Sequence, residues 1–480
     1  MNKNITQTLN SIILVMFFVV ILTGIFLRFY RIGAESFWFD EIYGINIASF
    51  NFGDVISGKI ADPGNPSLFF AILSLWKKYF ELTESNSRIP AAIFSILTFP
   101  LIYLSAKAMY KKKNFWIFST VLFSVSLFSI LYAQEARSYS LFVFLTSLSL
   151  WLQSLIIFNR YKKDESKILI GYLIVSLLGF YTHYLFFYVL FLQTIIWGIF
   201  LILQKRTRLF LYLLLGIFLT FGIFFLLWGN SHLLPAIFSQ ERGYDIDQRV
   251  GYDFHSLREP RFSLESFCFL VFNGISTLLF NRSDGILNVL FSLVLILPVI
   301  LLLIFFPNKK KEKKILTFLI FPIVITLFLA VFTSFGDLIN NTYYFIFLIP
   351  YVTLFVGYLF SLFPFKKLGL LTFSIFIILS IFSDYAYLKN PHKTQLREVA
   401  EYLLDKTNSR SRVYTPAGDI LYVLSYYFQS WGRKFYVSSN LLENTTKFVV
   451  KRPQDDTGLV LENFQKIQFY DLELYERKTD

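Results

Sequence analysis

The segment 184–203 has the sequence YLFFYVLFLQTIIWGIFLIL and contains no charged residue. A helix needs about 20 consecutive apolar residues to cross the hydrocarbon core of a bilayer. Lys205, Arg206 and Arg208 follow this segment directly. The pattern predicts a transmembrane helix that ends in a positively charged loop.

The composition of the whole chain agrees with a membrane protein. Of 480 residues, 55% are hydrophobic and only 16% are charged, whereas an average soluble domain is about 25% charged. This excludes a conventional soluble enzyme, and the many apolar residues exclude a disordered chain. Cys268 is the single cysteine, so neither an intrachain disulfide nor a cysteine-based metal site can form.

Similar apolar stretches recur along the chain, and we expect about 11 transmembrane helices. The segment 11–28 is kept as a span because no small-residue cleavage site follows it. Another apolar stretch, 262–280, carries Glu265 and Asn273; these favour an interfacial or re-entrant helix over a span. The expected spans are 11–28, 87–108, 115–132, 139–158, 168–183, 184–203, 209–228, 285–306, 315–334, 343–363 and 369–384.

The charged loops between these spans set the expected orientation. Alternate short loops carry seventeen Lys and Arg residues, whereas the intervening short loops carry only Arg137. Basic loops stay in the cytoplasm, so we expect a multi-pass protein of the inner (plasma) membrane with a cytoplasmic N-terminus and an extracytoplasmic C-terminus. The net charge of +13 is accounted for by these loops, and no nucleic-acid partner is expected. The seventeen are Lys111, Lys112, Lys113, Arg160, Lys162, Lys163, Lys167, Lys205, Arg206, Arg208, Lys309, Lys310, Lys311, Lys313, Lys314, Lys366 and Lys367.

Three longer segments then fall on the outer side: 29–86, 229–284 and the tail from 385. The tail has charged residues in a helical pattern between Arg397 and Lys406, followed by short β-like runs at 412–414 and 447–450. We therefore predict an all-α polytopic membrane domain over 1–384 and a small extracytoplasmic α/β domain over 385–480.

The first outer segment contains adjacent carboxylates in Trp38-Phe39-Asp40-Glu41. Neighbouring residues do not share a helix face, so Asp40 and Glu41 are expected to have different roles. A carboxylate beside aromatic residues at a membrane surface is partly desolvated, a setting that suits a general base. The alternative is a solvated acidic pair in a loop.

Two further motifs lie in or next to this segment. Asp62-Pro63-Gly64-Asn65-Pro66 has the composition of a fixed turn, and Arg88-Ile89-Pro90 begins the second span. Asp62, Asn65 and Arg88 are candidate substrate-binding residues, and a purely structural turn is the alternative.

Ionisable residues also occur at the outer ends of two spans. Glu135 and Arg137 lie where such groups are costly, so a functional role is the default hypothesis, and an arginine can hold a phosphate through paired hydrogen bonds. An ion pair between these two that only fixes a helix end is the alternative. His183 is a candidate binding residue, with packing as its alternative. Four histidines in the chain make a histidine-cluster metal site improbable but leave room for a divalent metal bound by carboxylates; no cofactor is certain.

Taken in order, these motifs resemble the prokaryotic membrane glycosyltransferases of the protein-mannosyltransferase type (glycosyltransferase family 39-like), which have the GT-C fold. The resemblance covers about the first 200 residues. The motifs that carry it are Trp38 to Glu41, Asn65-Pro66 with Phe69 and Phe70, Arg88 to Ala92, Gln134 to Tyr139, and Thr182-His183.

The resemblance implies a polyprenyl-phosphate-linked sugar as donor and transfer on the outer face with inversion at the anomeric carbon. It also implies that Asp40 is the catalytic base, that Glu41 supports this base, and that Arg137 steadies the lipid phosphate. The turn reads Asn65-Pro66-Ser67 where the family often has a second proline. A late span begins with Tyr343-Tyr344 where many members have Arg-Tyr, so Arg258, Arg261 or Arg282 would have to replace that cation.

Other functions remain open at this point. A lipid-glycan flippase or transporter would also be polytopic, although transporters tend to carry polar residues near the membrane midplane. An O-antigen ligase or polymerase, or a non-catalytic relative, are further alternatives. The partners expected are the polyprenyl-phosphate sugar, membrane lipids, and an acceptor that is a protein, a lipid or a glycan. The sequence names neither the sugar nor the acceptor.

Overall fold

The computed structural model describes residues 3–62, 64–158, 164–233, 310–332, 342–362, 366–391, 393–406, 412–433, 436–439, 446–455, 457 and 461–478. The expected span 285–306, the apolar stretch 262–280 and Arg258, Arg261 and Arg282 lie outside these residues.

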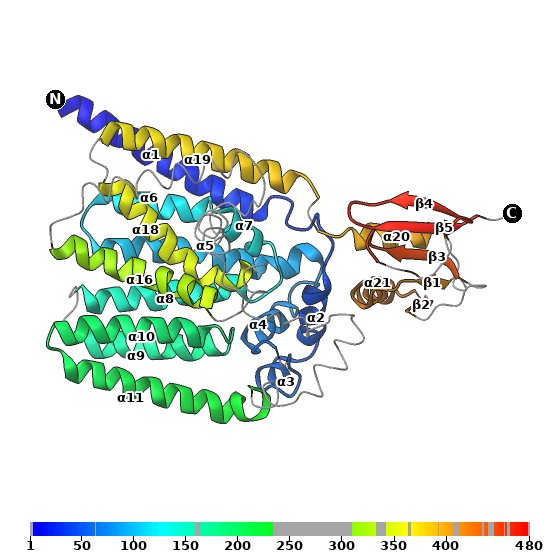
Figure 1. Cartoon of the computed structure of the whole chain (residues 1–480), viewed down its shortest axis with the longest axis horizontal. Helices are drawn as coiled ribbons and strands as arrows, with labels where there is room; N and C mark the ends of the chain where they lie inside the picture. The colour runs from blue at the N-terminus through cyan, green and yellow to red at the C-terminus, as the bar shows by residue number, and fades with distance from the viewer. Residues whose placement is uncertain are drawn as a thin grey trace.

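Long helices form a bundle with their axes roughly side by side, and a small sheet domain lies beyond one end of it (Figure 1). Among the described residues, six helices are long and apolar enough to cross a membrane, or seven if the bent pair α6–α7 is one span. The bundle contains α1 (Lys3–Phe29), α5 (Glu84–Met109), α6 (Lys113–Ser124), α7 (Leu127–Ala133), α8 (Tyr139–Ile157), α9 (Glu165–Phe180), α10 (Phe186–Leu203), α11 (Thr207–Phe224) with the π-helix η2 (Phe225–Leu233), α16 (Lys310–Phe332), the 3₁₀ helix η3 (Thr342–Leu348), α18 (Ile349–Leu362) and α19 (Lys366–Lys389).

Every expected span other than 285–306 is largely helical, although 115–132 corresponds to the α6–α7 pair and 343–363 to η3 followed by α18. The chain is a polytopic, largely helical membrane protein, as the apolar pattern predicts. Two turns expected to carry the cytoplasmic charges, α5–α6 and α10–α11, lie at the bundle end opposite the sheet domain (Figure 1).

The segment 115–132 is not one straight span, because α6 and α7 are bent by 52° at Val125–Ser126. Arg28 of α1 is buried at this break and donates to the carbonyls of Ser124 (2.7 Å) and Phe123 (3.3 Å), the second of which also accepts from the Ser126 N–H at 3.3 Å. A Cβ atom at Gly24 would lie 2.4 Å from the Ser124 carbonyl oxygen. The glycine therefore lets α1 approach closely enough for Arg28 to satisfy the broken helix end.

Three short helices connect α1 to α5 at the end of the bundle nearest the sheet domain (Figure 1). They are α2 (Phe39–Ala48), α3 (Phe52–Ile56) and α4 (Leu68–Trp76). The N-terminus of α2 carries Asp40 and Glu41 in its first turn, where the helix dipole favours negative charge. This segment is a folded cap on the bundle rather than an open loop.

The C-terminal domain is a five-stranded sheet with two helices, which confirms the small α/β domain. The strand order is β2-β1-β3-β5-β4; β1 is parallel to β2 and β3, and β5 is antiparallel to β3 and β4. The elements are α20 (Leu396–Lys406), β1 (Arg412–Tyr414), α21 (Gly418–Ser430), β2 (Tyr436–Ser438), β3 (Thr446–Lys451), β4 (Phe464–Gln468) and β5 (Glu473–Arg477).

Helix α2 belongs to the cores of both parts of the protein. Phe37, Ile42 and Ile45 pack into the hydrophobic core formed by α20, α21 and the sheet. Ile47 and Ala48, at the other end of the helix, pack into the core of the membrane bundle. The C-terminal domain is therefore completed by residues from the first connection, far away in the sequence.

This sharing predicts that Ile42→Ala destabilises the C-terminal domain. Ile42 is fully buried, and truncation of a buried isoleucine costs about 2–5 kcal/mol. Limited proteolysis of the purified protein should show faster cleavage within residues 393–478. Ile93→Ala, at a 38% exposed position on α5, is the matched control; equal cleavage rates in the two variants would contradict the shared core.

Candidate functional site

Polar side chains from distant segments meet at the bundle end that faces the C-terminal domain. They come from the first turn of α2, the turn at Asp62, the start of α5 and the connection 134–138 between α7 and α8. Most of the residues singled out in the sequence lie in this group, and their partners show that they have different roles.

Glu41 and Arg88 form a fully buried, two-pronged ion pair. The Nε and Nη2 atoms of Arg88 donate to the two carboxylate oxygens of Glu41, each at 2.8 Å. The side chains are 0% and 1% exposed. Paired hydrogen bonds of this kind fix the geometry of both groups and are stronger than those between neutral groups.

The remaining donors of Arg88 bind the chain that precedes α2. Nη1 donates to the carbonyls of Ile32 (3.0 Å) and Glu35 (2.9 Å), and Nη2 donates to that of Ser36 (3.0 Å). The guanidinium is thus saturated by the protein. These contacts hold the start of α2 and favour a structural role for Arg88; its expected role in substrate binding stays a prediction.

Glu41 also contacts the connection between α7 and α8. The backbone N–H of Ala136 donates to its Oε1 at 2.8 Å. Although burial disfavours the charge, Arg88 and Lys393 lower the pKa of Glu41 to about 2. Glu41 is therefore an anion that joins three segments, and it is not the solvated carboxylate of the alternative interpretation.

Asp40 faces a different partner from Glu41, as their adjacent positions predict. Its carboxylate Oδ2 lies 3.5 Å from Nη2 of Arg137, and its side chain is 35% exposed. The backbone carbonyl of Asp40 also accepts from Nη1 of Arg137, at 3.1 Å. Arg137 is only 6% exposed, and its Nε–H has no hydrogen-bond partner among the described residues. The pair combines an accessible carboxylate with a guanidinium that retains a donor.

The surroundings of Asp40 raise its pKa. Burial is the main cause; Arg137 opposes it, and the carboxylates of Asp62 and Glu41 add to it. Asp62 is held in its turn by Gly64 N–H and the Asn65 amide, which donate to its two oxygens at 2.8 Å each. Asp62 and Asn65 thus form a turn beside Asp40, and Asp62 contributes negative charge to the site.

Glu135 and Arg137 do not pair with each other, so the helix-end ion pair considered for them is wrong. Glu135 lies 3.7 Å from Nζ of Lys393, and Lys393 also lies 3.5 Å from Glu41. Burial raises the pKa of Glu135, and Lys393 opposes this shift. Glu135 therefore faces the segment that enters the C-terminal domain, whereas Arg137 faces Asp40.

Lys393 is a residue that the sequence analysis did not single out. It follows the last expected span closely, on the side that the sequence predicts to be extracytoplasmic, where basic residues are disfavoured. A lysine at such a position could have been singled out from the sequence. Lys389, which is exposed, occupies a similar position, so the position alone does not distinguish the two lysines.

His183 has the environment of a packing residue. Its ring stacks on Phe142 with centroids 5.0 Å apart and an interplanar angle of 14°. The backbone N–H of Leu185 donates to its Nδ1 at 3.1 Å. His183 thus supports the wall behind Arg137, which favours the packing alternative.

The metal site left open by the sequence finds no support in this geometry. Within the described part of the chain, no three His, Cys, Asp or Glu side chains are grouped as metal ligands.

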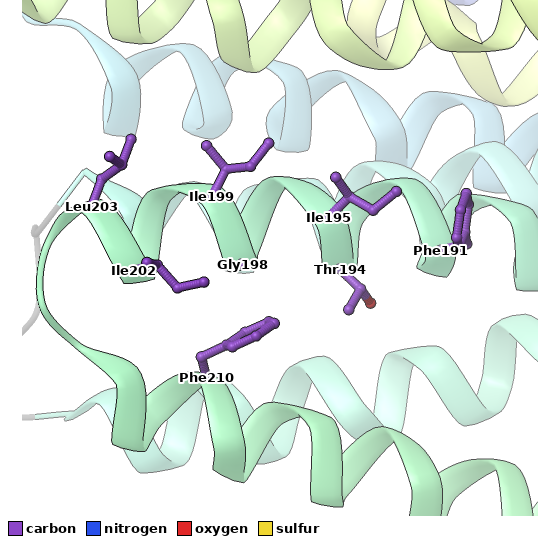
Figure 2. Close-up of a pocket in the computed structure, with 8 residues that line it drawn as sticks. All are labelled: Phe191, Thr194, Ile195, Gly198, Ile199, Ile202, Leu203 and Phe210. Carbon is purple, nitrogen blue, oxygen red and sulfur yellow. The ribbon is translucent and has the colours of Figure 1, made fainter.

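An apolar hollow of about 490 Å³ lies between α10 and α11 (Figure 2). Figure 2 shows Phe210 reaching from α11 toward α10, and a Cβ atom at Gly198 would lie 2.9 Å from its ring. Of the lining residues, only Thr194 has a polar side chain. The hollow therefore offers a surface for hydrocarbon but no acid or base. Its lining residues are Phe191, Thr194, Ile195, Gly198, Ile199, Ile202, Leu203 and Phe210.

Comparison with solved structures identifies the fold. The chain is similar to the crystal structure of ArnT from Cupriavidus metallidurans bound to undecaprenyl phosphate, with a TM-score of 0.58 and 10% sequence identity over 96% of this chain and 97% of that chain. The chain has a GT-C fold. The chain also matches the apo state of the same ArnT, with a TM-score of 0.46 and 11% identity over 96% of this chain and 97% of that chain. A further match is an Archaeoglobus fulgidus oligosaccharyltransferase in complex with Zn and sulfate, with a TM-score of 0.47 and 10% identity over 91% of this chain and 67% of that chain.

No protein-family model matches the sequence, and no curated protein matches it either. The GT-C fold inferred from the motifs is thus confirmed by structure, whereas the closer resemblance to the protein-mannosyltransferase type stays a prediction.

The low pKa of Glu41 predicts a specific loss of stability in acid. Its pKa is about 2 in the folded protein against an ordinary value of 4.5. A carboxyl group whose pKa is lowered by folding stabilises the protein above its unfolded pKa, and this stabilisation is lost as the pH falls through the folded value. The melting temperature in detergent should therefore fall between about pH 5 and about pH 2, and Glu41→Gln should flatten this fall.

Glu401→Gln is the control, because that side chain is 59% exposed. A pH dependence that is the same in Glu41→Gln and in the wild type would show that Glu41 does not titrate in this way.

Proposed function

We propose that this protein is an integral membrane glycosyltransferase. It transfers a hexosyl or pentosyl group from a polyprenyl-phosphate-linked donor to an acceptor on the extracytoplasmic face, with inversion. The observation that carries the proposal is the accessible Asp40 carboxylate beside Arg137, at one end of a membrane bundle with the GT-C fold. The bound lipid of the ArnT structure, undecaprenyl phosphate, supports a donor of the same class.

The chemistry follows from this pair. An acceptor hydroxyl attacks the anomeric carbon, the bond from that carbon to the phosphate oxygen breaks, and Asp40 takes the hydroxyl proton. The raised pKa of Asp40 suits this role, because a general base works best with a pKa close to the working pH. The polyprenyl phosphate leaves with the bonding electrons and gains negative charge.

Arg137 is the group that meets this charge. Stabilisation of developing charge by a preorganised donor is usually the largest contribution to catalysis. The buried Nε–H of Arg137 is without a partner in the described structure, and its Nη2 contact with Asp40 is long at 3.5 Å. Arg137 can therefore turn toward a phosphate without breaking a short ion pair.

The location of the pair suits a lipid-linked donor. Helix α2, whose first turn carries Asp40, lies at the same end of the bundle as the sheet domain (Figure 1). The charged loops predict that this end is extracytoplasmic. A prenyl chain can stay in the bilayer while its phosphate reaches Arg137. The buried charges at this end, rather than at the middle of the helices, favour surface chemistry over transport.

The direct test is to incubate the purified protein in nanodiscs with a panel of polyprenyl-phosphate sugars and to measure released polyprenyl phosphate. Release from at least one donor is expected. No release from any donor, together with translocation of a lipid-linked sugar in liposomes, would overturn the proposal in favour of a flippase.

Asp40→Asn should abolish this transfer while leaving membrane insertion intact. Loss of a general base lowers turnover by about 10²–10⁴-fold, and asparagine keeps the size and shape of the aspartate side chain. Asp54→Asn is the control, since Asp54 is 31% exposed and pairs with Lys59 on the same connection. Near wild-type turnover by folded Asp40→Asn protein would exclude Asp40 as the base.

A further inference from the structure

Lys393 brings a buried positive charge to the back of the proposed site. It lies in the short segment between α19 and α20, and its side chain is 15% exposed. Its Nζ lies 3.5 Å from Glu41 Oε2 and 3.7 Å from Glu135 Oε1, and it has no hydrogen bond to any described residue. The ammonium is therefore held between two carboxylates by charge.

The segment around Lys393 is attached to the chain that precedes α2. The backbone N–H of Lys393 donates to Glu35 Oε2 at 3.1 Å. Arg397 donates to the carbonyls of Gly33 (3.2 Å) and Ala34 (2.8 Å). The Ser36 hydroxyl donates to Glu398 at 2.8 Å. The segment that leads into the C-terminal domain and the segment that leads into α2 are thus held together by hydrogen bonds.

Lys393 balances the negative charge of Glu135. Arg88 is already committed to Glu41, so Lys393 is the cation within ion-pair distance of Glu135 in the described structure. A cavity of about 170 Å³ adjoins the cluster. The cavity lets a side chain or a water shift when the charge balance changes. Its lining residues are Glu35, Arg88, Leu131, Tyr132, Gln134, Glu135, Tyr387 and Lys393.

We propose that Lys393 is a positioning residue, whose ammonium holds the Glu41 and Glu135 carboxylates in place and thereby couples docking of the C-terminal domain to the geometry of the Asp40–Arg137 pair. This inference rests on the proposed function. Glu135 is separated from Arg137 by one residue and Glu41 is next to Asp40, so a shift of either carboxylate moves a member of that pair.

The coupling accounts for the position of the C-terminal domain without giving it a reacting group. When Lys393 is withdrawn, Glu135 becomes a buried carboxylate without a counter-charge, which is strongly unfavourable. The connection 134–138 then has to rearrange or take up a proton. Either change shifts Arg137 relative to Asp40 and so weakens the stabilisation of the leaving phosphate in the transition state.

The test compares Lys393→Met, Lys393→Arg and Lys393→Met/Glu135→Gln in the full-length protein. A positioning role lowers kcat and leaves donor KM nearly unchanged. We expect Lys393→Met to lower kcat about tenfold or more, Lys393→Arg to keep about half of it, and the double variant to regain roughly fivefold, because it lacks the unpaired carboxylate.

Hydrogen exchange provides a readout that needs no substrate. Lys393→Met should speed amide exchange in residues 33–48 about tenfold, because a weakened attachment lowers the free energy of local opening. Lys389→Met, at an exposed position four residues earlier, should not change it. If wild-type protein releases no polyprenyl phosphate, the proposed function fails, and this exchange experiment still tests the coupling.

Three results would overturn the role of Lys393. One is turnover by folded Lys393→Met within about twofold of the wild type, with unchanged exchange in residues 33–48. Another is an equal loss of kcat in Lys393→Met and Lys393→Arg. The third applies if Lys393→Met does not fold: the double variant should then fold, and its failure to do so would show that the charge balance is not the cause.

Discussion

The site depends on one interaction, the buried ion pair between Glu41 and Arg88. Two charges in an apolar interior are tolerated only when they are paired and fully hydrogen-bonded, and this pair meets that condition through Ile32, Glu35, Ser36 and Ala136. Asp40 precedes Glu41, and Arg137 follows Ala136, which donates to Glu41. The buried ion pair therefore brings Asp40 and Arg137 together, although these two residues are 97 positions apart in the sequence.

The same constraint explains why the two parts of the protein cannot be treated as separate units. Arg88 fixes the chain before α2, and this chain receives hydrogen bonds from Arg397 and provides Phe37 to the core of the C-terminal domain. The N–H of Phe37 donates to the Tyr427 hydroxyl at 2.8 Å. The C-terminal domain is thus connected to the start of α2, and through this helix start to Asp40.

Much of this could be predicted from the sequence, and the failures have a common physical reason. The spans and the α/β domain follow from local hydrophobic patterns. Asp40 and Arg137 became candidates because charge is costly at a membrane surface, and the structure places them in contact. The bend at Val125–Ser126 was missed because the uncharged run 115–132, despite its serines, does not reveal a buried Arg28 that binds the Ser124 carbonyl. The partners of Glu135 and Arg88, and the role of Lys393, depend on contacts between distant segments that no local pattern records.

The most direct test of this account is a double-mutant cycle on Glu41 and Arg88, measured by the stability of the protein in detergent. Each single variant, Glu41→Gln or Arg88→Met, leaves a buried charge without its partner and should cost about 3–5 kcal/mol. The account predicts that the double variant is much more stable than the sum of the two losses implies. Additive losses would contradict it, because they would mean that the two side chains act independently and that the ion pair does not organise the site.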